Sequence, residues 1–111
     1  MLAKIKSVFH DNGNIHNFYK WEGSKESLLS NDEMKEKYEE GLILFGHNKL
    51  IIIDGYYDTY ERWYEDVEIG DYLYVNERGG VEHRKEDGIE FIDDREYKIY
   101  KENGSYRIRK E

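Results

Sequence analysis

The chain lacks cysteine and proline altogether and contains a single alanine. Without cysteine it can form neither a disulfide framework nor a thiolate zinc site, and redox chemistry gives no indication of its compartment. Long apolar runs are absent as well. Even Leu50 to Ile53, which no apolar run exceeds, is far too short to span a bilayer, and the first residues lack the apolar stretch of a signal peptide. These absences predict a cytoplasmic protein that does not contact a membrane.

Catalytic and metal-binding patterns are also missing. The four histidines show no spacing that would organise a catalytic triad, and there is neither a His-x-x-x-His pair nor a glycine-rich phosphate-binding loop. Asp54 and Asp58 could supply hard oxygen ligands, but their spacing does not match that of a calcium-binding loop. We therefore expect a protein that is not an enzyme and that holds no metal and no cofactor.

Acidic and aromatic residues are what the chain has in excess. Its 111 residues, a length typical of a single domain spanning 1–111, carry a formal net charge of −8, which opposes direct binding of nucleic acid or anionic lipid. The acid lies in the centre: residues 54–71 hold seven acidic residues and one arginine, whereas both ends are net basic. Aromatic residues make up 15% of the chain, so they must supply much of a modest core.

Turn residues predict two hairpins. Leu2–Phe9 and Ile15–Trp21 flank a polar turn, which pairs Phe9 with Phe18, or with His16 if the turn shifts by one residue. The second turn, Asn103-Gly104, is the stronger signal and pairs Ile99 with Ile108 and Lys101 with Tyr106. The opposite, basic face of that hairpin would carry Lys98, Tyr100, Arg107 and Arg109.

One helix is predicted near the middle of the chain, starting at a capping box at Ser30 and stopping at Gly41. The apolar runs Leu42–Phe45 and Leu50–Ile53 that follow are typical of central strands covered on both faces. Residues 67–75 resemble the stretch that enters a strand in small Src-homology-3-like barrels, with the strand itself beginning near Tyr72. We therefore expect an α+β fold, in which a mostly antiparallel, curved or barrel-like β-sheet has one short helix packed on it.

The acidic aromatic segment, residues 54–66, is the most unusual part of the chain. Helical spacing would align its rings into one stripe, whereas its residue types individually favour strands, and we predict a short helix or ordered loop over 56–66. Its rings could simply be core and its acids solvent-facing, but tyrosine, tryptophan and arginine often carry interface energy. The candidate interface residues are Asp54, Tyr56, Tyr57, Asp58, Tyr60, Glu61, Arg62, Trp63, Tyr64, Glu65 and Asp66.

Composition also indicates an origin. One alanine, no proline and many lysine, isoleucine, asparagine, glutamate and tyrosine residues are typical of AT-rich coding sequence. In size, acidity and absence of catalytic motifs the chain resembles small phage-encoded accessory proteins of the anti-defence kind, such as anti-CRISPR proteins. The resemblance is compositional and transfers no residue roles. It implies a non-enzymatic inhibitor that binds a basic host or defence protein through the acidic aromatic segment, with nucleic-acid mimicry as one form.

Two other functions stay open. A small-molecule binder, such as a sponge for a nucleotide signal, would stack Trp63 or Trp21 on a base and use an arginine for phosphate, and it requires a concave, basic-lined pocket. The candidate arginines are Arg62, Arg78 and Arg84. An assembly module would instead pair through an exposed edge strand of the C-terminal hairpin, for instance in a homodimer.

Overall fold

The computed structural model describes residues 2–6, 15–46, 49–54, 63–92, 97–102 and 105–110. Within these ranges the chain forms three small antiparallel sheets, two short α-helices and one 3-10 turn. The strands are β1 (Leu2–Ile5), β2 (Ile15–Asn17), β3 (Tyr19–Lys20), β4 (Ile43–Gly46), β5 (Lys49–Asp54), β6 (Trp63–Val67), β7 (Tyr72–Val75), β8 (Val81–Arg84), β9 (Ile89–Phe91), β10 (Tyr97–Glu102) and β11 (Ser105–Lys110). The helices are α1 (Lys25–Leu29) and α2 (Asp32–Glu39), and the 3-10 turn is η1 (Glu86–Gly88). The predicted α+β class with antiparallel strands is confirmed.

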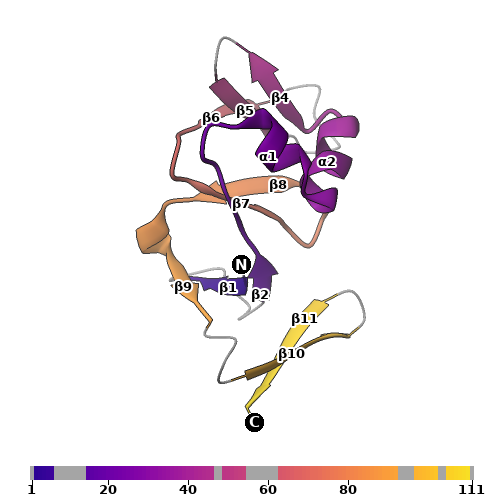
Figure 1. The fold of residues 1–111 in the computed structure, drawn as a ribbon, viewed down its shortest axis with the longest axis vertical. Coiled ribbons are helices and arrows are strands. Elements are labelled where there is room, and N and C mark those ends of the chain that lie inside the picture. The colour runs from indigo at the N-terminus through magenta and orange to yellow at the C-terminus, as the bar shows by residue number, and fades with distance from the viewer. Residues whose placement is uncertain are drawn as a thin grey trace.

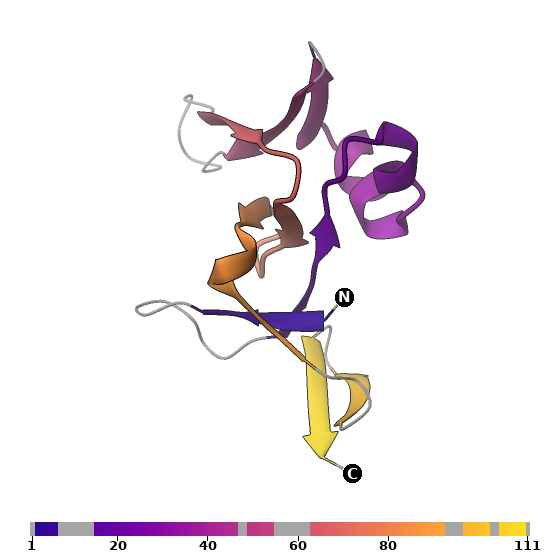
Figure 2. The same cartoon turned by 60° about the vertical axis from the view of Figure 1, so that its left-hand side comes forward.

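The sheets are stacked along the long axis of the molecule, which extends 45 Å. The sheet β4-β5-β6 lies at one end beside the helices, β3-β7-β8 lies in the middle, and the sheet of order β10-β11-β2-β1-β9 forms the other end (Figures 1 and 2). The expectation of one curved or barrel-like sheet with one helix was wrong, since the described strands form three separate sheets and a second helix is present. β7 begins at Tyr72 as predicted, but it is the centre of an open sheet.

Two hydrophobic cores lie between these layers, and β7 contributes to both because successive side chains of a strand point to opposite faces. Leu73 faces the first core, whereas Tyr72 and Tyr74 face the second. The helix-side core contains Trp21, Leu28, Met34, Ile43, Leu50, Ile52, Val67, Leu73 and Val81. The aromatic core contains Ala3, Phe18, Tyr72, Tyr74 and Ile89. The middle sheet is therefore covered on both faces.

Both helices begin at a polar side chain that caps free backbone amides. Ser24 Oγ accepts from the Ser27 N–H at 3.2 Å at the start of α1. Asn31 Oδ1 accepts from two amides in the first turn of α2, at 3.0 and 3.1 Å. The predicted start at Ser30 was one residue early, and α1 was not predicted. Neither described helix has the length or apolar character needed to cross a membrane.

Gly41 ends α2, as predicted. Its φ of +81° lies in the left-handed region, which glycine adopts without the steric cost of a Cβ atom. The Gly41 N–H donates to the Tyr38 carbonyl and the Leu42 N–H donates to the Lys37 carbonyl, both at 3.0 Å. These two bonds define a Schellman motif, which satisfies the last carbonyls of the helix.

The C-terminal hairpin has the predicted register. Ile99 lies opposite Ile108, and Lys101 lies opposite Tyr106, as a two-residue turn at Asn103-Gly104 requires. The hairpin joins the rest of its sheet through β11, which pairs with β2, so β10 is at the edge of that sheet.

The first hairpin forms, but its predicted register was wrong. β1 and β2 pair with Leu2 opposite Asn17 and Lys4 opposite Ile15, which matches neither of the two pairings expected for Phe9. Phe9 itself lies outside the described residues. Phe18 packs instead against Tyr74 of the middle sheet, with ring centroids 4.8 Å apart.

The two apolar runs form β4 and β5, which pair with Ile43 opposite Ile52. β5 is the central strand of its sheet, as predicted, whereas β4 is an edge strand. Ile43, Leu50 and Ile52 belong to the helix-side core. Leu44, on the other face of β4, is 38% exposed. The prediction that both strands are covered on both faces was therefore wrong for β4.

Candidate functional site

The described part of the acidic aromatic segment lies on the β5–β6 hairpin. Asp54 ends β5 and lies opposite Trp63, which begins β6. Residues 63–66 are extended, so the predicted short helix or ordered loop was wrong for them. β6 is extended because it pairs over its whole length with the apolar strand β5. The candidate residues Tyr56, Tyr57, Asp58, Tyr60, Glu61 and Arg62 lie outside the described residues.

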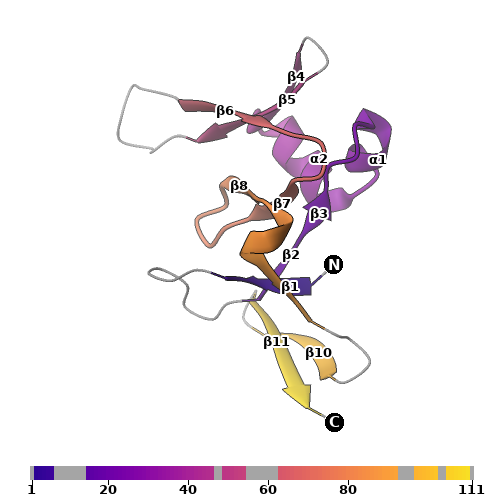
Figure 3. The same cartoon turned by 90° about the vertical axis from the view of Figure 1, so that its left-hand side faces the viewer.

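β6 is an edge strand that shows polar and aromatic groups to solvent. Tyr64 is 61% exposed, and Glu65 and Asp66 are exposed beside it. Figure 3 shows β6 above β7 and β8, at the end of the molecule opposite the β10–β11 hairpin. Of the eleven candidate residues, the structure thus brings Tyr64 and Asp66 together on one face of β6, while Glu65 is exposed on the opposite face.

Two acids of β6 have basic or histidine partners. Asp66 lies 3.5 Å from Lys49 Nζ, and both side chains are more than 60% exposed. Glu65 Oε2 lies 3.2 Å from His83 Nε2 on β8, which ties the end sheet to the middle sheet. An exposed ion pair contributes little because water screens it. Asp66 therefore remains available to a partner despite its ion pair with Lys49, whereas Glu65 makes a structural contact with His83.

The outer face of β4-β5-β6, turned away from the helix-side core, is apolar at its centre. Strand alternation and register place Leu44 beside Ile51 and Asp66, and Ile53 beside Tyr64. Lys49 lies on the same face, next to Asp66. We call this surface the outer sheet face, and its residues are Leu44, Lys49, Ile51, Ile53, Tyr64 and Asp66.

A second polar group surrounds Asp71, which is only 1% exposed. Its carboxylate accepts from Lys85 Nζ at 2.6 Å and from the Glu68 N–H at 3.1 Å, and lies 3.0 Å from His83 Nδ1. Burial raises the pKa of Asp71, but the hydrogen bonds from Lys85, His83 and Glu68 outweigh it, so this pKa lies below its usual value. Hydrogen bonds to Asp71 and Glu68 raise the pKa of Lys85.

In this conformation the Asp71 group has a structural role, because its contacts hold neighbouring segments together. An aspartate that orients a histidine is also part of hydrolytic active sites, but there the second ring nitrogen faces the substrate. Here that nitrogen, Nε2 of His83, already faces Glu65. Only the doubly protonated ring can donate to both carboxylates. Among the described residues, no group of histidines and acids is arranged to hold a metal ion.

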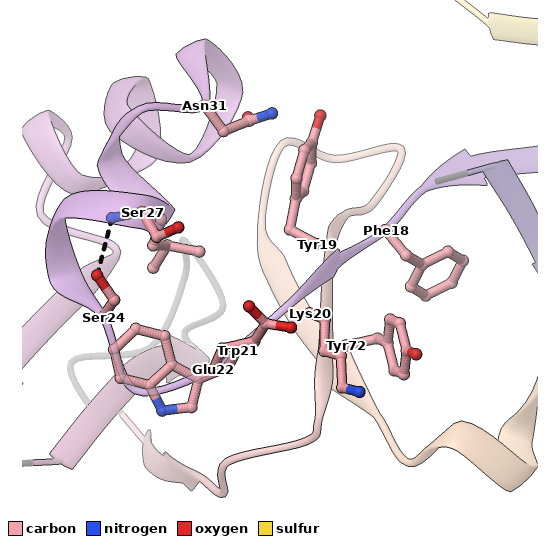
Figure 4. A pocket seen from close by; sticks show the side chains of 10 residues that line it. Phe18, Tyr19, Lys20, Trp21, Glu22, Ser24, Ser27, Asn31 and Tyr72 are labelled. Atoms are coloured by element: carbon pink, nitrogen blue, oxygen red, sulfur yellow. Dashed lines mark hydrogen bonds between the residues drawn. The ribbon is translucent and has the colours of Figure 1, made fainter.

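A hollow of about 330 Å³ lies between β3 and α1. Figure 4 shows Tyr19 and Asn31 on one side of it and Trp21 beside Ser24 on another. One lysine and one glutamate, Lys20 and Glu22, are the charged residues among its described lining, which contains no arginine. Among the described lining residues, Trp21 is the one ligand residue expected from the sequence, and it is buried.

Sequence reasoning missed two features of this region. Asp71, His83 and Lys85 are brought together by the β7–β8 pairing, and they have no spacing in the sequence that could have indicated a group. The outer sheet face had a signal, because the unbroken apolar run of β5 supplies Ile51 and Ile53 to the side opposite the core. Comparison of the chain with protein-family models, with curated proteins and with solved structures found no match in any of the three.

Proposed function

We propose that the chain is a non-enzymatic binding protein, of the inhibitory or anti-defence kind, that engages a basic partner protein through the acidic aromatic segment. The observation that supports this most is the exposure of Tyr64, 61%, on the same face of an edge strand as the exposed acid Asp66. Tyrosine is one of the residue types that most often carry binding energy at interfaces, and here an exposed tyrosine lies on the same strand as exposed acids. Nucleic-acid mimicry is one form that such binding could take.

The charge of the segment supports a basic partner. Residues 54–71 carry seven acids and one arginine within a chain of net charge −8. Complementary charge chiefly accelerates encounter, whereas buried rings chiefly slow dissociation. The proposal therefore gives Asp66 and Tyr64 separable roles in one interface.

The two alternatives have less support. A nucleotide sponge needs a basic-lined pocket, and the described lining of the hollow near Trp21 has one lysine, balanced by one glutamate. Assembly through the C-terminal hairpin is supported by the edge position of β10. Neither alternative accounts for the exposed Tyr64 on β6.

The test uses a partner recovered from the native host with the tagged protein and then purified. Asp66→Lys should slow association and reduce its salt dependence, and Tyr64→Ala should mainly speed dissociation. Surface plasmon resonance at several salt concentrations measures both rates. Glu65 is a poor choice for charge reversal, because its contact with His83 would mix folding with binding.

Glu90→Lys is the matched control, because Glu90 is an exposed acid on β9 in a different sheet. It changes the net charge of the chain by the same amount as Asp66→Lys and leaves β6 unaltered. The proposal fails if both β6 variants bind like the wild type, or if Glu90→Lys slows association as much as Asp66→Lys.

A further inference from the structure

The outer sheet face carries more apolar surface than a solvent-facing sheet normally does. An antiparallel sheet packed on one side usually alternates apolar and polar residues along each strand. β5 does not: Ile51 and Ile53 lie on the side opposite Leu50 and Ile52. Leu44 is 38% and Tyr64 is 61% exposed on that same side. Ile53 is already covered within the chain, with 8% exposure, whereas Leu44, Ile51 and Tyr64 leave apolar surface open to solvent.

The charges on this face cancel. Lys49 and Asp66 are 64% and 62% exposed and lie 3.5 Å apart. The chain as a whole carries −8, so two copies repel one another over most of their surfaces. The outer sheet face, with one charge of each sign among its described side chains, is a place where that repulsion is small.

We propose that the outer sheet face is the interface of a two-fold homodimer. In such a dimer each copy presents the same patch, so the patch must complement itself. One base and one acid beside an apolar centre meet this condition, because Lys49 of each copy can reach Asp66 of the other while Leu44, Ile51 and Tyr64 pack together.

The size of the face sets the strength of the dimer. A patch three strands wide, at about 4.8 Å per strand, and five residues long, at about 3.3 Å per residue, is smaller than the roughly 800 Å² per partner of a standard interface. The dimer is therefore weak and forms in the micromolar range or above. Tyr64 and Asp66 also belong to the partner site, so dimerisation and partner binding exclude one another, a consequence that rests on the proposed function.

Sedimentation velocity of the purified chain, from about 1 µM to about 1 mM, tests the dimer in the range that a small interface requires. Lys49→Glu and Asp66→Lys should each weaken self-association by about tenfold, since each places like charges together at two symmetric positions. An equimolar mixture of the two variants should restore it. In the mixed dimer each intermolecular pair joins an acid to a base, while the pair within each chain remains like-charged.

Leu44→Glu should abolish self-association, and Ile69→Glu is its matched control. Ile69 is 72% exposed but lies in the turn after β6 and not on the outer sheet face. A wild-type chain that stays monomeric over the whole range, a mixture that fails to recover, or an equal effect of Ile69→Glu overturns the dimer. No partner is present in this experiment, so its failure leaves the proposed function intact. If Tyr64→Ala and Asp66→Lys instead left partner binding unchanged, the proposed function alone would be overturned.

Discussion

Asp71 and His83 are in hydrogen-bond contact, with Oδ2 of the aspartate 3.0 Å from Nδ1 of the histidine. The contact joins the turn before β7 to the middle of β8, and Lys85 contacts the second oxygen of the same carboxylate. Among the described residues, Asp71 is the one charged residue that is buried. Its three partners satisfy a group that would otherwise be costly to remove from water.

Asp71→Asn should lower the free energy of unfolding by about 1 to 3 kcal/mol, because it removes the charge that Lys85 and His83 bind and leaves a buried amide in its place. Urea unfolding followed by circular dichroism measures the change. Asp66→Asn is the matched control, since its ion pair with Lys49 is exposed, and it should change stability by less than about 0.5 kcal/mol. Equal effects at the two positions would contradict a structural role for Asp71.

The stability that Asp71 contributes should depend on pH in the acid range. Its pKa is lower in the folded chain than in the unfolded one, so folding favours the ionised form. This contribution is complete above the unfolded pKa of about 3.9 and is lost as the pH falls through the lower folded value. The difference in unfolding free energy between wild type and Asp71→Asn should thus shrink below about pH 4. A difference that grows on acidification would show that the carboxylate is not stabilised by its partners.

Leu73→Ala should lower the free energy of unfolding by about 2 to 5 kcal/mol, because it leaves a cavity at a fully buried position of the helix-side core. Leu44→Ala makes the same chemical change on the outer sheet face, where Leu44 is 38% exposed, and it should cost less than half as much. Denaturant unfolding at low protein concentration, where the chain is monomeric, compares the two. A Leu44→Ala cost as large as that of Leu73→Ala would mean that the outer face is covered within one chain.

Gly41→Ala should destabilise the protein by about 1 to 2 kcal/mol, because alanine in the left-handed region brings its Cβ against the backbone. Nothing lies within 4 Å of a Cβ built at Gly41, so the cost is conformational and not a clash with neighbours. Gly88→Ala is the control, since Gly88 also has open space but no positive φ. Thermal unfolding should place Gly41→Ala below and Gly88→Ala at or above the wild type.

Sequence predicted the elements that are fixed locally. The Asn103-Gly104 turn sets the register of its hairpin because a two-residue turn allows one pairing of the flanking strands. Gly41 ends α2 for an equally local reason. The register of the first hairpin could not be obtained in this way. β1 pairs with β9 as well as with β2, so the register of the first hairpin also depends on a strand that is distant in the sequence.

Sequence predicted less of the candidate site. The rings of residues 56–66 fit a helical stripe, yet Trp63–Val67 is a strand because β5 offers it a complete antiparallel partner. Helical periodicity is a local signal, and tertiary pairing overrode it. α1 is only five residues long, too short for such a pattern to be seen. The exposure of Tyr64 also depends on which side of β6 faces the core, and only the register with β5 decides this.

β7 has a consequence for how the molecule unfolds. Leu73 belongs to the helix-side core and Tyr74 to the aromatic core, so one strand forms a wall of both. Opening either core displaces β7 and exposes apolar surface in the other, which couples the two into one cooperative unit. The backbone amides of β7 should therefore exchange with deuterated solvent more slowly than those of any other described strand, and only through opening of the whole molecule.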